Sequence, residues 1–190
     1  MTGKLSETDK KELLRIARAA ISSAVIGQPL EKLDLSTFST VLQADGAAFV
    51  TLTMSGKLRG CIGALEAFKP LVLDVQEHAI AAAQQDYRFP PVFNNEVESL
   101  KIEISYLTPI HRLEYKDNND LISKLRPGID GVLIRDGSRR ATFLPQVWGQ
   151  ISDGREFMSH LCIKMGAQPD LWQKKQIEVF VYQVEEFSED

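Results

Sequence analysis

Residues 47–65 carry the pattern of a β-hairpin, which restricts the fold of this chain more than any other feature of its sequence. The run AAFVTLTM is followed by Ser55 and Gly56, and then by the run KLRGCIGAL. Threonine and valine favour strands, and glycine permits the positive φ angles of tight turns. The pattern therefore predicts two antiparallel strands joined at Ser55 and Gly56.

Three helices are predicted from apolar residues that recur at helical spacing. The first lies within residues 6–25 and begins at Ser6, a good N-cap, with an acidic residue three positions later. The second runs from about residue 70 to 85 and has a proline suited to its first turn. The third lies within residues 155–167, where Gly166 is placed to end it.

Strands are predicted in the segments that remain. Residues 100–109 alternate apolar and polar side chains, residues 131–145 form a hairpin that turns at Asp136 and Gly137, and residues 176–187 close the chain as one strand. The later strands have no long helices between them. We therefore expect an α+β fold rather than a doubly wound parallel sheet.

Length, charge and composition exclude several classes of protein. A chain of 190 residues is about one ordinary domain, and no apolar run approaches the about 20 residues that span a bilayer. The net charge of -4 argues against nucleic-acid binding, which needs a concentrated basic surface. The N-terminal run lacks the apolar core of a signal peptide, so we expect a cytoplasmic protein whose two cysteines are free thiols.

Cys61 is the main candidate for chemistry. Because side chains alternate along a strand, Arg59 and Cys61 are predicted to share a face, about 7 Å apart at the backbone. A nearby guanidinium favours the thiolate, which is the nucleophilic form of cysteine. Gly60 and Gly63 would let a ligand or another chain segment approach the backbone closely. Together these residues predict a small pocket for an anion.

The same residues also fit a structural role, and the pattern leaves both alternatives open. Cysteine is often buried, glycines in strands often mark bulges or close packing, and an arginine near a strand end often pairs with a carboxylate. A nucleophilic cysteine usually needs a base. His78 is the nearest candidate in sequence, whereas His111 and His160 could approach Cys61 only through the fold.

Neither a metal site nor a nucleotide site is indicated by the sequence. His160 and Cys162 are two positions apart on a predicted helix, a spacing that points the side chains away from each other. The chain has no GxGxxG motif and no P-loop, so its motifs identify no cofactor.

Seven blocks of the sequence resemble the AMMECR domain family, known in bacteria and archaea as AmmeMemoRadiSam system protein A. The hexapeptide LRGCIG at residues 58–63 looks like the signature of that family. The similarity continues in the family's order and covers nearly the whole chain. The further blocks are DYRFPPV (86–92), IEISYLTP (102–109), PGIDGVLI (127–134), FLPQV (143–147), EFMSHLCIKMGAQPDLW (156–172) and VFVYQVEEF (179–187).

The resemblance implies a fold more firmly than a function. It implies a single domain over residues 1–190, with a mainly antiparallel sheet packed by helices and a smaller β-rich subdomain at about residues 108–145. Prokaryotic relatives are associated with a Memo-like protein and a radical SAM enzyme. These two are therefore the expected partners, as separate chains.

The resemblance also implies which residues form the site. The hexapeptide is the proposed functional site of the family, which here corresponds to Arg59, Gly60, Cys61 and Gly63. Arg88, from the similar D-x-R-F block, is a further candidate for binding a substrate or a partner. The tyrosine before it departs from the family's pattern, in which a smaller residue or proline is expected.

Two functions of different classes follow. In the first, the protein is an enzyme or enzyme subunit that uses Cys61 as nucleophile or covalent carrier, with Arg59 holding a small anionic group of the substrate. In the second, it is a non-catalytic binding or scaffolding module that presents the LRGCIG surface to a partner protein. The lack of a convincing acid–base set favours the second.

Overall fold

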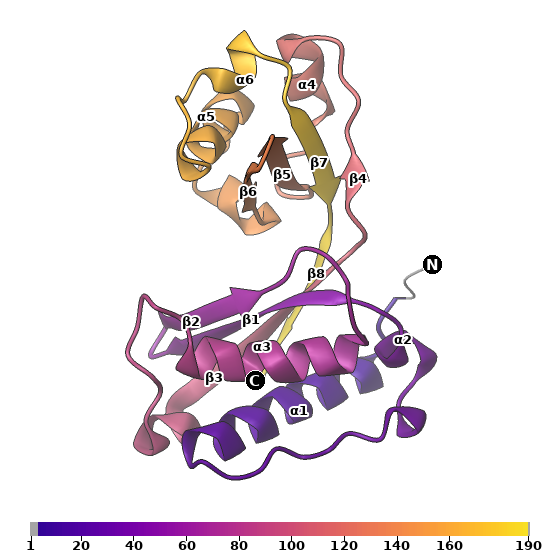
Figure 1. The fold of residues 1–190 in the computed structure, drawn as a ribbon, viewed down its shortest axis with the longest axis vertical. Helices are drawn as coiled ribbons and strands as arrows, with labels where there is room; N and C mark the ends of the chain where they lie inside the picture. Colours follow the sequence, from indigo (N-terminus) through magenta and orange to yellow (C-terminus); the bar gives the residue numbers. More distant parts are fainter. Residues whose placement is uncertain (1–3, 190) are drawn as a thin grey trace. The chain divides into compact units, whose positions relative to one another are not determined.

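The computed structural model describes residues 4–189, which form two compact units (Figure 1). The first unit comprises the described residues up to Leu107 together with those from Glu185 onward. The second unit spans Thr108–Val184. The chain is therefore continuous in the second unit and interrupted in the first, whose C-terminal segment returns after the second unit is complete.

The first unit is a four-stranded sheet with helices against one face. The strand order is β2-β1-β3-β8, so that β2 and β8 are the edge strands. Helices α1 and α3 lie side by side and share one apolar core with the sheet (Figure 1). The elements are α1 (Glu7–Val25), η1 (Leu35–Thr37), α2 (Thr40–Gln43), β1 (Ala47–Met54), β2 (Lys57–Gly63), α3 (Leu71–Gln84), η2 (Asn94–Ser99), β3 (Leu100–Leu107) and β8 (Val184–Ser188).

The predicted start of the first helix is confirmed. The Ser6 hydroxyl accepts a hydrogen bond from the backbone N–H of Asp9 at 3.2 Å, and the Asp9 carboxylate accepts one from the backbone N–H of Ser6 at 2.9 Å. This capping box satisfies amide groups that have no partner inside the helix. The apolar stripe of α1 is buried in the core, as its spacing predicted.

The predicted hairpin is confirmed as β1 and β2, which pair antiparallel. Ser55 and Gly56 form the turn with φ angles of 50° and 74°, the positive values that a two-residue hairpin turn requires. The pairing contains one irregularity. Leu52 lies opposite Gly60 whereas Thr53 lies opposite Leu58, which leaves Arg59 as an extra residue in a β-bulge.

The second unit has its own sheet and core. The strand order is β4-β7-β5-β6, and the pairs are antiparallel. The predicted hairpin at residues 131–145 is confirmed by β5 and β6. The elements are β4 (His111–Arg112), α4 (Asn118–Lys124), β5 (Gly131–Asp136), β6 (Arg139–Phe143), η3 (Pro145–Gly149), α5 (Gly154–Lys164), α6 (Leu171–Lys174) and β7 (Glu178–Tyr182).

Two sequence-based expectations differ from this architecture. The closing strand expected at residues 176–187 is two strands, because the chain leaves the second sheet after β7 and joins the edge of the first sheet as β8. The smaller part expected at residues 108–145 extends to Val184. It does so because β7 lies between β4 and β5, and because α5 and α6 supply much of the second core.

The fold class is confirmed: the chain is α+β, with mainly antiparallel sheets packed by helices. None of the helices between residues 4 and 189 combines the length and apolar character that a membrane span needs.

The turn of the first hairpin generates a stability prediction. Ser55 has a positive φ, a conformation that is energetically unfavourable for residues other than glycine. Asparagine tolerates this conformation better than serine. We expect Ser55→Asn to raise the free energy of unfolding by about 0.5–1 kcal/mol, and Ser55→Val to lower it, because a β-branched residue resists this φ. Urea unfolding would measure both changes, and equal midpoints for all three proteins would contradict the prediction.

Candidate functional site

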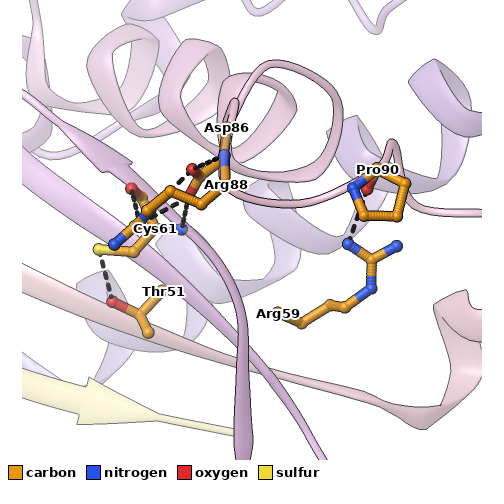
Figure 2. A network of polar contacts seen from close by, with 6 residues as sticks. All are labelled: Thr51, Arg59, Cys61, Asp86, Arg88 and Pro90. Carbon is orange, nitrogen blue, oxygen red and sulfur yellow. Dashed lines mark hydrogen bonds and ion pairs between the residues drawn. The ribbon is translucent and has the colours of Figure 1, made fainter.

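Cys61 lies on the edge strand β2, on the face of the sheet that the helices do not cover. It pairs with Thr51 of β1, whereas the neighbouring Gly60 faces α3. The Thr51 hydroxyl donates a hydrogen bond to the Cys61 sulfur, with an Oγ1–Sγ distance of 3.2 Å (Figure 2). The cysteine is half-buried and free. Its thiol is therefore held in place by a hydroxyl and partly open.

The backbone of Cys61 is held by two side chains of the loop that follows α3. Asp86 accepts a hydrogen bond from the Cys61 N–H at 2.9 Å, and Arg88 donates one to the Cys61 carbonyl at 3.2 Å (Figure 2). An edge strand leaves such groups without a neighbouring strand. Asp86 and Arg88 therefore take the place of that strand at this one residue, and we call this arrangement the clasp.

The clasp is also an ion pair. Arg88 donates from Nε to Asp86 Oδ1 at 2.9 Å and from Nη2 to Asp86 Oδ2 at 2.6 Å, while its backbone N–H donates to Oδ1 at 3.2 Å. Asp86 is buried. The hydrogen bonds from Arg88, helped by the Cys61 N–H, hold the pKa of the Asp86 carboxyl well below its ordinary value despite that burial. Asp86 is therefore charged at any pH near neutral.

Arg59 does not share a pocket with Cys61 as the sequence predicted. It occupies the bulge, where regular alternation of side chains is lost. Its guanidinium forms a two-pronged ion pair with Glu96 at 2.9 and 2.8 Å, and it donates to the Pro90 carbonyl at 2.8 Å. In Figure 2 it points toward Pro90, whereas the Cys61 sulfur points toward Thr51.

Arg59 is instead an anchor for the loop. It is buried, and it also donates to the Pro91 carbonyl at 3.2 Å. The hydrogen bond from Arg59 holds the pKa of the Glu96 carboxyl below its ordinary value, so this pair is charged on both sides. An anionic ligand would have to displace Glu96 to reach this guanidinium.

The two glycines of the hexapeptide are explained by close packing. A Cβ atom on Gly60 would lie 2.1 Å from the backbone oxygen of Ala82 in α3. A Cβ atom on Gly63 would lie 2.4 Å from the backbone oxygen of Ala48 and 2.5 Å from Phe49 Cα in β1. These positions require glycine because backbone atoms already occupy the space. Gly60 thereby lets α3 pack directly against β2.

His78 is engaged by an acid rather than by the thiol. Its Nδ1 lies 3.1 Å from Oδ2 of Asp74, a buried carboxylate that also accepts the Ala48 N–H at 3.0 Å. Within residues 4–189, the Thr51 hydroxyl is the one side chain that hydrogen-bonds the Cys61 sulfur. His78 therefore makes no hydrogen bond to the Cys61 sulfur through which it could act directly as a base in this structure.

The remaining candidates lie in the second unit. His111 is exposed on β4, and His160 on α5 lies 3.7 Å from Glu156. Cys162 is free and fully buried, and burial raises the pKa of its thiol. Between residues 4 and 189, no three His, Cys, Asp or Glu side chains gather in a way that could hold a metal ion.

Thr51 and Asp86 are the site residues that the sequence analysis missed. A two-residue turn with regular pairing would place Thr51 opposite Gly60, and only the bulge brings it opposite Cys61. One sequence feature pointed to Asp86, because it lies two residues before Arg88 in the same family-like block, DYRFPPV. Its role depends on the path of the loop, which residue spacing does not give.

Comparison with known proteins identifies a family. The AMMECR1 family model matches residues 14–187. A protein of Methanothermobacter thermautotrophicus is 38% identical over 189 residues, which cover 98% of this chain and 97% of that protein. A protein of Methanocaldococcus jannaschii is 35% identical, with 93% and 88% covered. The crystal structure of an uncharacterized protein from Pyrococcus horikoshii matches with a TM-score of 0.89 at 32% identity, covering 99% of this chain and 95% of that one.

The contact between Gly60 and α3 generates the prediction for this part of the molecule. We expect Gly60→Ala to lower the free energy of unfolding by about 2–3 kcal/mol, because a backbone oxygen cannot move aside as a flexible side chain can. Gly149→Ala is the matched control, because nothing lies within 4 Å of a Cβ atom added there. Urea unfolding would compare the two, and equal stability of both variants would contradict the packing explanation.

Proposed function

This chain belongs to the AMMECR1 family, and from that premise we propose that it is an enzyme, or a subunit of one, that works through the thiol of Cys61. The observation that carries the proposal is the way in which this one residue is held. Its backbone is fixed on both sides by the clasp, and its sulfur accepts a hydrogen bond from the Thr51 hydroxyl. Cys61 is the nucleophile or the covalent carrier.

The sulfur and the backbone of Cys61 are held by separate groups. The Thr51 hydroxyl donates to the sulfur, and the Arg88 guanidinium donates to the carbonyl of the same residue. Fixing the backbone also reduces the cost of aligning the nucleophile with a substrate. Within residues 4–189 no histidine or carboxylate hydrogen-bonds the sulfur. Its proton is therefore lost to solvent, to the substrate or to a group that a partner supplies.

The proposal includes partners and a compartment. The similarity of LRGCIG and its companion blocks to AmmeMemoRadiSam system protein A supports a Memo-like protein and a radical SAM enzyme as separate chains that act with this one. A reducing cytoplasm would keep both thiols free. The substrate is a small molecule with an anionic group.

The proposal is tested by the reactivity of the thiols in the folded protein. We expect iodoacetamide to modify Cys61 at pH 7 several-fold faster than the same thiol in the urea-unfolded chain, because the folded protein holds the sulfur in one position on a fixed backbone. Cys162 should react only after unfolding, because it is fully buried. Mass spectrometry of the two peptides across pH would measure both rates.

A matched variant isolates the contribution of the hydroxyl. Thr51→Val keeps the shape of the side chain but removes the donor, and it should slow the alkylation of Cys61 several-fold. An inaccessible Cys61, or one as slow as the thiol of the unfolded chain, would overturn the proposed function.

A binding or scaffolding module is the second candidate, and one observation favours it. Tyr87 is 94% exposed although its neighbours Asp86 and Arg88 are fixed in the clasp. Phe93 of the same loop is exposed, while its N–H donates to Glu96 at 2.8 Å. Aromatic side chains on a fixed backbone are typical anchors of protein interfaces, because little conformational freedom is lost on binding.

Capture of a purified Memo-like protein would test this second function. We expect the double variant Tyr87→Ser, Phe93→Ser to weaken capture by about tenfold or more, the effect of losing aromatic anchors. Cys61→Ser keeps the size of the side chain and should leave capture unchanged, whereas it should abolish a thiol-dependent activity. Capture that survives the double variant would count against the scaffolding module.

A further inference from the structure

We propose that Arg88, rather than Arg59, binds the anionic group of the substrate beside Cys61, and that Asp86 is the residue that positions Arg88 for this role. This inference rests on the proposed thiol function and makes it more specific. The substrate class is a small molecule that carries a carboxylate or phosphate group close to the carbon or other atom that the thiol attacks.

Arg59 has little hydrogen-bonding capacity left. Its Nε, Nη1 and Nη2 atoms all donate hydrogen bonds within the protein, and the charge of its guanidinium is matched by Glu96 at 2.8 Å. It is also buried. Freeing it would leave the half-buried carboxylate of Glu96 without its partner, which is costly.

Arg88 has hydrogen-bonding capacity that its contacts within the protein do not use. Its Nε and Nη2 atoms bind Asp86, and Nη2 also binds the Cys61 carbonyl. Within residues 4–189, its Nη1 atom donates no hydrogen bond, and the side chain is 44% exposed. A guanidinium held along one edge presents its remaining N–H groups in a fixed direction, which suits a planar carboxylate or a phosphate.

Arg88 is also bound to the residue that carries the reacting atom. Its Nη2 is bound to the carbonyl of Cys61 itself, and Figure 2 shows the two residues in one network. An anion bound by this guanidinium would therefore lie beside Cys61.

Asp86 acts through Arg88. Its buried carboxylate accepts three hydrogen bonds from Arg88 and one from the Cys61 N–H, so it fixes both the guanidinium and the strand. It also offsets the charge of Arg88. Binding at this site thus depends on hydrogen bonds at short range rather than on a diffuse positive field.

Two alkylating reagents that differ in charge test the inference. Iodoacetate and iodoacetamide both form a bond from the Cys61 thiolate to a CH2 group and release iodide, but the first carries a carboxylate and the second an amide. The measured quantity is the ratio of their rates at Cys61. We expect this ratio in the folded protein to exceed that of the unfolded chain about 3- to 10-fold, the net effect of one hydrogen bond at a partly exposed site.

Substitutions test whether Arg88 is the residue that raises the rate ratio. Arg88→Gln should bring the ratio down to that of the unfolded chain, and Arg88→Lys should give an intermediate value. The control Arg15→Gln, at an arginine on α1 of the same unit that pairs with Glu12, should leave the ratio unchanged. If neither Arg88 variant changes the ratio, the inference is wrong. Slow reaction of the wild type with both reagents would instead overturn the proposed function.

A second measurement covers the case in which the Arg88 variants do not fold. Inorganic phosphate should protect Cys61 of the wild-type protein from iodoacetamide, and sodium chloride at equal ionic strength should protect it less. Protection that phosphate and chloride provide equally would overturn the inference, because only a hydrogen-bonded anion site distinguishes them.

Discussion

The β-bulge at Arg59 is the constraint on which the candidate site depends. Regular pairing from the turn would place Cys61 opposite Val50, which is fully buried on the helix-covered face of the sheet. The extra residue shifts the register, so that Cys61 lies opposite Thr51 on the other face. The bulge is held in place because the buried guanidinium of Arg59 is bound by Glu96 and by backbone carbonyls.

Most of the hexapeptide residues discussed above serve the structure of β2, and Cys61 is the one on which the proposed function depends. Arg59 anchors the loop, and Gly60 and Gly63 admit the backbones of α3 and β1. Each of these three residues has a structural role inside the first unit. Within this network the thiol of Cys61 and the outer edge of Arg88 stay partly open. The proposed site consists of these two groups, held by residues whose own roles are structural.

The sequence predicted the elements better than their junctions. The hairpin at Ser55 and Gly56, the capped first helix and the α+β class are local consequences of turn chemistry, capping and periodicity, and all are confirmed. The closing segment was predicted as one strand because its apolar pattern is continuous across residue 183. The division into β7 and β8 depends on which sheet edge each half meets, and a continuous pattern carries no sign of that.

The candidate site shows the same limit at the level of single residues. By itself the sequence determined that a cysteine stands among glycines on the second strand of a hairpin, with Arg59 nearby, because composition and turn residues encode such local facts. Only the tertiary structure decided which face the thiol occupies and which guanidinium lies beside it. The one-residue bulge reverses the sheet face that simple alternation predicts for Cys61, and the loop that follows α3 brings Arg88 to it. The physical reason is that both depend on contacts between segments about 25 to 37 residues apart.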